Sequence, residues 1–206
     1  MHQRLAVIDY GTGNAFSLRK AFQRIGTGVD HTADPEVIRR SDKIVLPGVG
    51  HFGRTMERLR SNSLLDVLNE EVLNKRKPIL GVCLGMELFA ARSEEGGAEG
   101  LNWIGGEVVR ISVKDPIRYK IPHVGWNTAR VVRPGRLLKG VDAAAEFYFL
   151  HSYHFVPRSE TPITARTEYE GGFVSAVEQG NIFGVQFHPE KSFENGAKVL
   201  ENFLDV

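Results

Sequence analysis

The sequence predicts an α/β fold with a mostly parallel central sheet, helices on both faces of that sheet and additional β strands in the C-terminal half. In the first half, short apolar runs alternate with segments whose apolar residues recur at helical spacing. This alternation is typical of βαβ units, whose parallel strands are buried on both faces. The second half contains several β-prone runs separated by turn residues, which predicts the additional strands.

The apolar runs of the first half predict buried strands, because each run is too short for a helix and is bounded by glycine or proline. These strands are predicted at 5–8, 44–46 and 79–82. Asn14 is a natural N-cap for a helix that ends at Gly26. Apolar positions from Met56 to Val72 predict further helical faces, and another helix is expected directly after Cys83.

The second half shows shorter β-prone runs and a closing helix. Strands are predicted at 108–111, 129–132, 146–150, 163–167, 173–177 and 181–187, and the helix at 197–204. The length of 206 residues suits one domain, and no repeat, low-complexity tract or linker divides the sequence. We therefore expect a single domain over residues 1–206.

Composition excludes several classes of function. The chain has 26 basic and 25 acidic residues and a net charge of +1, so no strong field favours nucleic acid or an anionic membrane. A single cysteine cannot close an intramolecular disulfide, so an oxidising compartment is not required. The apolar run at 5–8 is too short for a signal peptide, and no run approaches the ~20 residues of a spanning helix. We expect a cytoplasmic protein without nucleic-acid or membrane partners.

The only cysteine lies in Gly81-Val-Cys-Leu-Gly85, between a predicted strand and a predicted helix. This is the pattern of a nucleophile elbow, in which flanking glycines permit a sharp turn that exposes the central side chain. The N-terminus of the following helix would favour a thiolate and could hold an oxyanion. The alternative is a structural cysteine, because free cysteine is among the most buried residue types.

A general base and its orienting group are predicted far downstream, in Phe187-His-Pro-Glu190. A thiolate nucleophile needs such a base, and His188 followed by Glu190 at the end of an apolar strand supplies both groups. The alternative for His188 is a surface or structural histidine. Pro47-Gly-Val-Gly50 also ends a predicted strand, and its backbone N–H groups could point at a developing negative oxygen. The alternative for this run is a tight turn with a structural role alone.

Two other kinds of site are rejected. Gly11-Thr-Gly-Asn-Ala-Phe16 has Phe16 where a dinucleotide-binding turn needs glycine or alanine. His151-Ser-Tyr-His154 has no flanking ligands at metal-binding spacing, so no metal and no cofactor are expected.

Together these motifs resemble the class I, triad-type glutamine amidotransferases. Longer runs are similar to the glutaminase subunits of imidazole glycerol phosphate synthases, and the similarity spans about residues 5 to 203. Those runs are 8–14, 122–127, 147–153 and 184–192. The fold implied is that of the class I glutamine amidotransferases.

The resemblance implies a role for each matching residue. Cys83 would attack the side-chain amide of glutamine, with His188 moving protons and Glu190 orienting the imidazole. The oxyanion would be held by the N–H of Leu84 and by one in the turn near Val49 and Gly50. The residues implied to line the glutamine pocket are Glu87, His151, Ser152 and Tyr153.

The resemblance also implies a partner, a (βα)8-barrel cyclase on a separate polypeptide. That partner would use the ammonia to convert a phosphoribosyl-formimino carboxamide ribotide into imidazole glycerol phosphate and an aminoimidazole carboxamide ribotide, in histidine biosynthesis. Asn14, Trp126 and Lys191 match family positions at or near the interface. The alternative is that they are ordinary turn and surface residues, and this applies to Lys191 in particular.

Two features depart from the family. Glu87 stands where the family usually has glutamine, which would place a carboxylate near the thiolate and could raise the pKa of the thiol. The runs 92–96, 101–104 and 192–196 are similar to paralogous subunits that supply ammonia for sugar modification in surface polysaccharide synthesis. The alternatives are therefore that paralogous role, a catalytically weak subunit that binds and regulates a partner, and a stand-alone thiol hydrolase.

Overall fold

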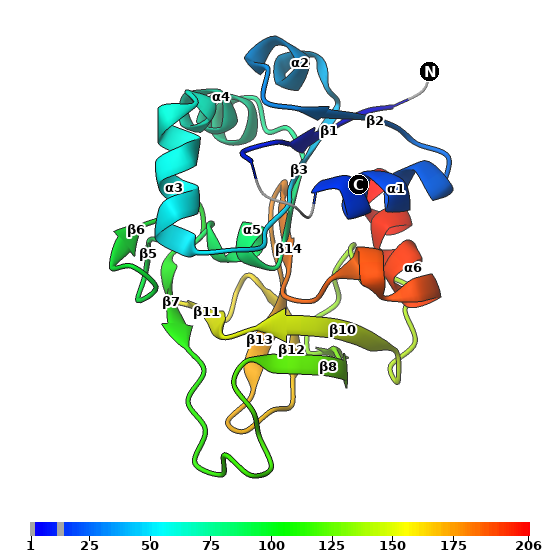
Figure 1. The fold of residues 1–206 in the computed structure, drawn as a ribbon. Helices are drawn as coiled ribbons and strands as arrows, with labels where there is room; N and C mark the ends of the chain where they lie inside the picture. Colours follow the sequence, from blue (N-terminus) through cyan, green and yellow to red (C-terminus); the bar gives the residue numbers. More distant parts are fainter. Residues whose placement is uncertain (1–2, 12–14) are drawn as a thin grey trace.

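The central sheet positions the residues singled out above. The computed structural model describes residues 3–11 and 15–206. Its eight-stranded sheet has the order β2-β1-β3-β4-β14-β13-β12-β9 (Figure 1). The strands from β2 to β14 are parallel, whereas β13, β12 and β9 pair antiparallel. In sheet order these strands are Gly28–Thr32, Arg4–Ile8, Lys43–Leu46, Ile79–Val82, Ile182–Val185, Phe173–Gln179, Ile163–Thr167 and Arg130–Val131.

Two smaller sheets accompany the central one. The first has the order β11-β7-β5-β6, with strands Tyr153–Pro157, Gly106–Arg110, Arg92–Ser93 and Ala98–Glu99. The second pairs β10 (Glu146–His151) with β8 (His123–Thr128). Figure 1 shows β10 and β8 lying across the end of the central sheet at which β14 finishes.

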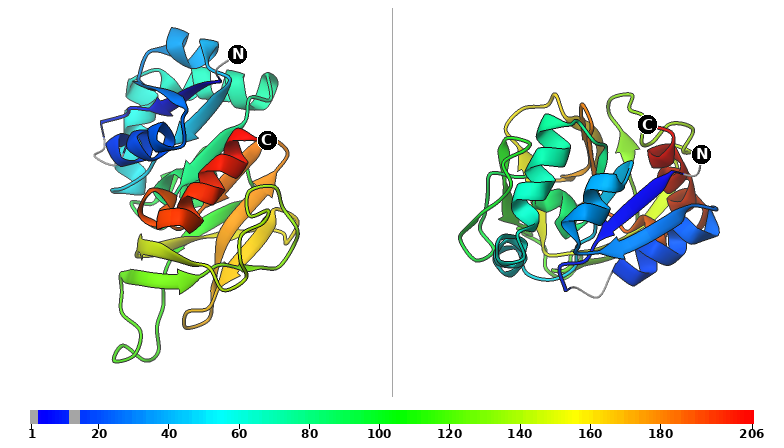
Figure 2. Two further views of the ribbon diagram at one scale, coloured as in Figure 1. Left: turned by 90° about the vertical axis from the view of Figure 1, so that its right-hand side faces the viewer. Right: turned by 90° about the horizontal axis from the view of Figure 1, so that it is seen from above.

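Helices cover both faces of the central sheet, as Figure 2 shows from above. On one face, α1 (Ala15–Arg24) and α6 (Phe193–Leu204) pack their apolar side chains on alternate residues of the parallel strands. The opposite face is covered by α2, α3, α4, α5 and the π-helical turn η1. These five elements are Pro35–Arg40, Phe52–Ser61, Leu64–Asn69, Leu84–Glu87 and Glu70–Asn74. Among the described residues, no helix has the length and apolar character to cross a bilayer.

The fold class predicted from the sequence is confirmed, and the differences have physical reasons. The edge strand β2, Gly-Val-Asp-His-Thr, is largely solvent-facing and therefore lacks the apolar run that marks a buried strand. Helix α6 begins at Phe193, before the predicted start, because Gly196 lets the helix approach the preceding turn. A Cβ at Gly196 would lie 1.9 Å from the carbonyl oxygen of Pro189. The predicted N-cap Asn14 lies outside the described residues.

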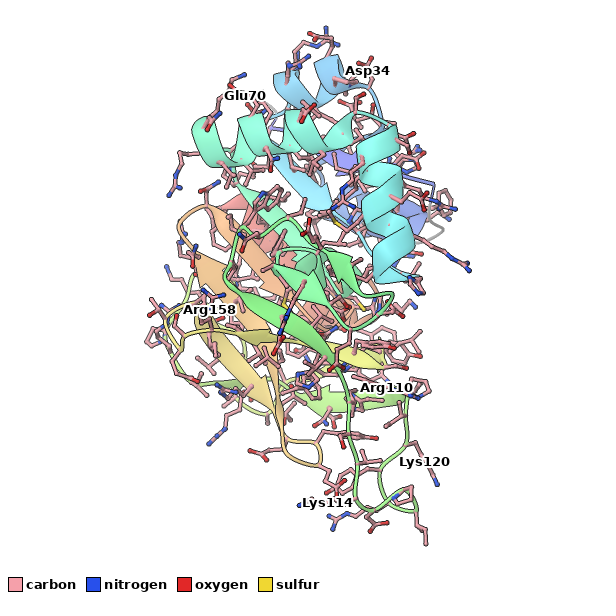
Figure 3. All side chains as sticks on the ribbon, turned by 90° about the vertical axis from the view of Figure 1, so that its left-hand side faces the viewer. Asp34, Glu70, Arg110, Lys114, Lys120 and Arg158 are labelled. Atoms are coloured by element: carbon pink, nitrogen blue, oxygen red, sulfur yellow. The ribbon has the colours of Figure 1, made fainter. Side chains whose placement is uncertain are left out.

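The long connection between β7 and β8 projects away from the sheets, and Figure 3 labels Lys114 and Lys120 on it. Its backbone is held by the segment that precedes β13. The N–H of Lys120 donates to the hydroxyl oxygen of Tyr169 over 2.8 Å, and that hydroxyl donates to the carbonyl oxygen of Lys120 over 2.8 Å. The connection therefore reaches Pro122 in a defined conformation.

Candidate active site

Cys83 lies at a strained corner between β4 and α5. Its backbone has φ 54° and ψ −113°, a conformation that few non-glycine residues adopt. The neighbouring glycines are sterically required: a Cβ at Gly81 would lie 2.6 Å from the oxygen of Gly85, and one at Gly85 would lie 1.9 Å from the oxygen of Leu46. This is the geometry of a nucleophile elbow.

His188 and Glu190 follow the end of the adjacent parallel strand. Val82 of β4 pairs with Val185 of β14, and the N–H of Cys83 donates to the carbonyl oxygen of Val185 over 2.8 Å. Nδ1 of His188 lies 2.9 Å from Oε1 of Glu190, and both side chains are fully buried. The carboxyl ends of two neighbouring strands therefore bring the three predicted catalytic residues to one edge of the sheet.

The surroundings of Cys83 favour a protonated thiol at rest. Burial raises the pKa of Cys83 well above its usual value, and the carboxylates of Glu87 and Glu190 raise it further. The backbone N–H of Leu84 and the side chain of Gln186 oppose this change in pKa. In the resting structure the thiol donates to the carbonyl oxygen of Leu150 over 3.7 Å. Attack on a substrate therefore requires a base to remove the thiol proton.

A cavity of about 280 Å³ opens beside the thiol. It brings together the predicted oxyanion residues and the predicted glutamine-binding residues, although these come from separate segments of the chain. The lining consists of Val49, Gly50, Cys83, Leu84, Glu87, Glu95, Pro122, Leu150, His151, Ser152 and Tyr153. The volume suits a small ligand and lies just below the usual range for ligand pockets.

The turn that contains Val49 and Gly50 is anchored on both sides. Before it, the carbonyl of Pro47 accepts a hydrogen bond from the hydroxyl of Tyr10. After it, the N–H of Phe52, at the start of α3, donates to the carboxylate of Glu95 over 2.6 Å. The Val49–Gly50 peptide therefore lies at the edge of the cavity between two fixed points, with Gly50 at φ +124°.

Glu87 is buried in the cavity wall and accepts a hydrogen bond from Gln186, a residue that the sequence motifs did not indicate. Nε2 of Gln186 lies 2.8 Å from Oε1 of Glu87 and 3.8 Å from Sγ of Cys83. Burial raises the pKa of Glu87 to about 8, against an opposing effect of the Gln186 hydrogen bond. The carboxyl group is therefore mostly neutral at pH 7.

His151 is held as a neutral ring. Its Nδ1 lies 2.8 Å from the carbonyl oxygen of Tyr153 and its Nε2 lies 3.1 Å from Nδ1 of His123. Burial lowers the pKa of His151 to about 3 and that of His123 to about 4. Ser152 and Tyr153 are half-buried and face the same cavity, so this segment offers polar groups without a cationic imidazole.

Trp126 and Lys191 lie elsewhere, on an open groove of about 1070 Å³ that is also lined by residues of α1 and by the start of α6. Trp126 is 44% exposed and stacks on Phe193, with ring centroids 5.3 Å apart and an interplanar angle of 5°. The third predicted interface residue, Asn14, lies outside the described residues.

Glu95 and Gln186 are the main residues that sequence reasoning missed. The only local signal for Glu95 is its position before the Gly96-Gly97 turn. The signal for Gln186 is that it is a polar residue inside an apolar run, directly before Phe187-His188. Among the described residues, no group of three or more histidine, cysteine, aspartate or glutamate side chains could hold a metal ion.

Comparisons with known proteins agree with this geometry. The family model for glutamine amidotransferase class-I matches residues 6–206. The imidazole glycerol phosphate synthase subunit HisH of Moorella thermoacetica is 46% identical over 98% of this chain and 94% of its own length. The chain belongs to the HisH family of class I glutamine amidotransferases.

Other relatives and structures extend this result. The HisH 2 subunit of Pseudomonas aeruginosa is 41% identical over 98% of this chain and 99% of its own. Among solved structures, a glutamine amidotransferase has a TM-score of 0.76 at 17% identity, covering 97% of each chain. The structure of PurLQS from Thermotoga maritima has a TM-score of 0.72 at 18% identity, covering 100% of this chain and 99% of that one. These structures confirm the class I glutamine amidotransferase fold, and the family predicted from the motifs is confirmed as well.

Proposed function

We propose that this chain is the glutaminase subunit of an imidazole glycerol phosphate synthase, and that it supplies ammonia to a separate (βα)8-barrel cyclase in histidine biosynthesis. The observation that carries the proposal is a cysteine on a strained elbow beside a 280 Å³ cavity, with a buried histidine–glutamate pair at the end of the adjacent strand. The HisH relatives are subunits of imidazole glycerol phosphate synthase, which supports the choice of pathway.

The reaction begins with proton transfer from the thiol of Cys83 to the imidazole of His188, whose other nitrogen faces Glu190. The thiolate then attacks the side-chain carbonyl carbon of glutamine. The negative oxygen of the tetrahedral intermediate is stabilised by the N–H of Leu84 and by an N–H of the turn at Val49 and Gly50. His188 returns its proton to the leaving nitrogen, so ammonia departs and a thioester remains.

Hydrolysis of the thioester completes the cycle. His188 removes a proton from water, the hydroxide attacks the thioester carbon, and the proton returns to the sulfur as glutamate leaves. Two carboxyl groups of the cavity, those of Glu87 and Glu95, are available to bind the α-ammonium group of the substrate. The neutral polar groups of His151, Ser152 and Tyr153 complete the binding site.

Ammonia is useful only while it remains unprotonated, because ammonium is not a nucleophile. A synthase must therefore receive ammonia without its passage through bulk water. The glutamine amidotransferase class-I model matches residues 6–206, and the HisH relatives are named as subunits of a synthase, which supports a partner polypeptide for the acceptor reaction. Trp126 and Lys191, which line the open groove, are proposed to contact that partner.

The test is a reconstitution with the (βα)8-barrel cyclase encoded by the same genome. Glutamate release is measured with and without the ribotide substrate, and we expect the isolated chain to be slow and the complex with ribotide to be faster by orders of magnitude. The matched control is Cys83→Ala, which should abolish glutamine-dependent turnover while the complex still uses added ammonium salts at alkaline pH. Glutamate release that persists in Cys83→Ala, or a fully active isolated chain, would contradict the proposal.

A further inference from the structure

Gln186 lies between two acidic groups of the site. One side-chain nitrogen serves both: it is 2.8 Å from Oε1 of Glu87 and 3.8 Å from Sγ of Cys83. Gln186 is fully buried at the end of β14, and its backbone N–H donates to the carbonyl oxygen of Ser175 over 2.9 Å. The backbone of Gln186 is therefore held by the sheet.

The orientation of this amide has a cost. Its oxygen is buried and, among the described residues, has no hydrogen-bond partner. A buried polar atom without a partner costs about 1–3 kcal/mol, so such atoms are uncommon in native proteins. Above the raised pKa of Glu87, about 8, the reverse orientation would place the amide oxygen against a carboxylate oxygen and close to the sulfur. In that alkaline range the carboxylate and the sulfur are both acceptors, and together they fix the direction in which the N–H groups point.

Glu87 and Gln186 have opposite effects on the nucleophile. The carboxylate of Glu87 raises the pKa of Cys83, because a second negative charge in a buried site disfavours the thiolate. The amide of Gln186 lowers the pKa of Cys83, because an N–H donor stabilises the thiolate. A primary amide is uncharged and carries two N–H groups on one nitrogen, so it can donate to the carboxyl group and to the sulfur together.

We propose that Gln186 is a positioning residue that sets the reactivity of Cys83, holding the carboxyl group of Glu87 with one N–H and presenting the other to the sulfur. The proposal rests on Cys83 being the nucleophile, as in the proposed function. It concerns the acidity of the thiol, however, which can be measured on the isolated chain without glutamine or a partner. Because residue 87 is an acid, the reactivity of the Cys83 thiol depends on Gln186 more than it would with a neutral residue at position 87.

The experiment measures the rate of alkylation by iodoacetamide between about pH 6 and pH 10, where the thiolate is the reacting species. Cys83 is the only cysteine, so the unmodified chain reports on this one site. The variants are Glu87→Gln, Gln186→Met, Gln186→Glu and the double variant that combines Glu87→Gln with Gln186→Met. Ser175→Ala is the matched control, because it removes a buried hydroxyl from the neighbouring strand without removing a donor to the sulfur.

Glu87→Gln should move the midpoint of the alkylation profile to lower pH, and Gln186→Met and Gln186→Glu should move it to higher pH. A shift of one unit is about a tenfold change in rate on the rising limb of the profile. Gln186→Met should shift the midpoint further in the chain that retains Glu87 than in the Glu87→Gln background. In the chain with Glu87, the amide also hydrogen-bonds the carboxylate whose negative charge raises the pKa of Cys83. Ser175→Ala should leave the midpoint unchanged.

Circular dichroism and thermal unfolding establish which variants are folded. A folded Gln186→Met or Gln186→Glu chain with an unchanged midpoint would overturn the proposal, as would a midpoint that does not fall in Glu87→Gln. The Glu87→Gln measurement stays decisive if both Gln186 variants fail to fold, because this variant retains the Gln186 amide and changes the size of residue 87 very little. The outcomes also separate the two claims: unchanged midpoints with normal glutaminase activity in the complex remove only this inference, whereas shifted midpoints without any glutaminase activity remove only the proposed function.

Discussion

His123 and His151 form a buried pair in which Nδ1 of His123 lies 3.1 Å from Nε2 of His151. Because His151 uses its Nδ1–H for the carbonyl of Tyr153, its Nε2 must accept, and Nδ1 of His123 must carry the donated proton. The two rings therefore determine each other's tautomer, and His151 lines the cavity beside Cys83. A proton added to Nε2 of His151 would break this arrangement.

The pair predicts a loss of stability in mild acid. Burial lowers the pKa of His123 from 6.5 to about 4 and that of His151 from 6.5 to about 3. Below pH 6.5 the unfolded chain therefore binds protons that the folded chain excludes, so the free energy of unfolding falls as pH falls from 6.5 toward 4. His123→Gln keeps a donor for His151 and should reduce this loss by about 1–2 kcal/mol near the acid end of the window.

Urea denaturation at a series of pH values measures this effect. The control is His31→Gln, which changes a partly exposed histidine on the edge strand β2. If His123→Gln and the unmodified chain lose stability in parallel between pH 6.5 and about 4, the neutral pair is not the cause.

The buried carboxyl group of Glu87 predicts a pH dependence of stability with the opposite sign. Burial raises its pKa from 4.5 to about 8, so the folded chain retains a proton that the unfolded chain has lost within this window. The free energy of unfolding should therefore decline as pH rises from 4.5 to about 8 and then level off. Glu87→Gln should remove the decline and be more stable than the unmodified chain at the alkaline end, by about 1–3 kcal/mol.

The comparison again uses urea denaturation, with Glu57→Gln as the control because Glu57 is exposed on α3. A Glu87→Gln chain that is no more stable than the unmodified chain at pH 8 would mean that Glu87 is ionised without penalty.

Close backbone approach at the elbow gives a third prediction. A Cβ at Gly48 would lie 2.3 Å from the backbone nitrogen of Gly85, so Gly48→Ala forces the turn that contains Gly48 away from the elbow at Cys83. We expect a loss of about 2–4 kcal/mol in stability, as for other overpacked or strained core sites, and a lower glutaminase kcat in the complex. Gly28→Ala is the matched control, because a Cβ there meets nothing within 4 Å and no positive φ is involved. Equal stability of the two variants would show that the turn at Gly48 can move freely.

Local patterns in the sequence identified the elbow at Cys83 and the His188–Glu190 pair because each motif carries its own backbone requirement. They did not identify Gln186 or Glu95, whose positions depend on strand register and on a contact with the start of α3. The sequence did not predict the edge strand β2 for a related reason. A polar strand has no distinctive composition of its own and is defined by its pairing with the neighbouring strand, here β1. Long-range pairing, which a single sequence does not display, accounts for these omissions.

The stacked pair of Trp126 and Phe193 predicts where the partner subunit binds. Both rings are exposed, at 44% and 80%, and they stack with an interplanar angle of 5° on the groove that also includes Lys191. Large exposed aromatic side chains are typical anchors of protein interfaces. Trp126→Ala should therefore weaken the complex with the barrel cyclase by about 2 kcal/mol or more, whereas its partial exposure predicts little change in the stability of the isolated chain.

Isothermal titration calorimetry with the barrel cyclase measures the affinity, and thermal unfolding measures the stability of the isolated chain. Val132→Ala is the matched control, because Val132 is also 44% exposed but follows β9, at the far edge of the central sheet. If Trp126→Ala binds as tightly as Val132→Ala, the cyclase docks elsewhere, and the groove beside α1 and α6 is not the interface. A selective loss of affinity in Trp126→Ala would instead place the barrel over the turn that carries His188 and Glu190, since that turn leads directly into α6.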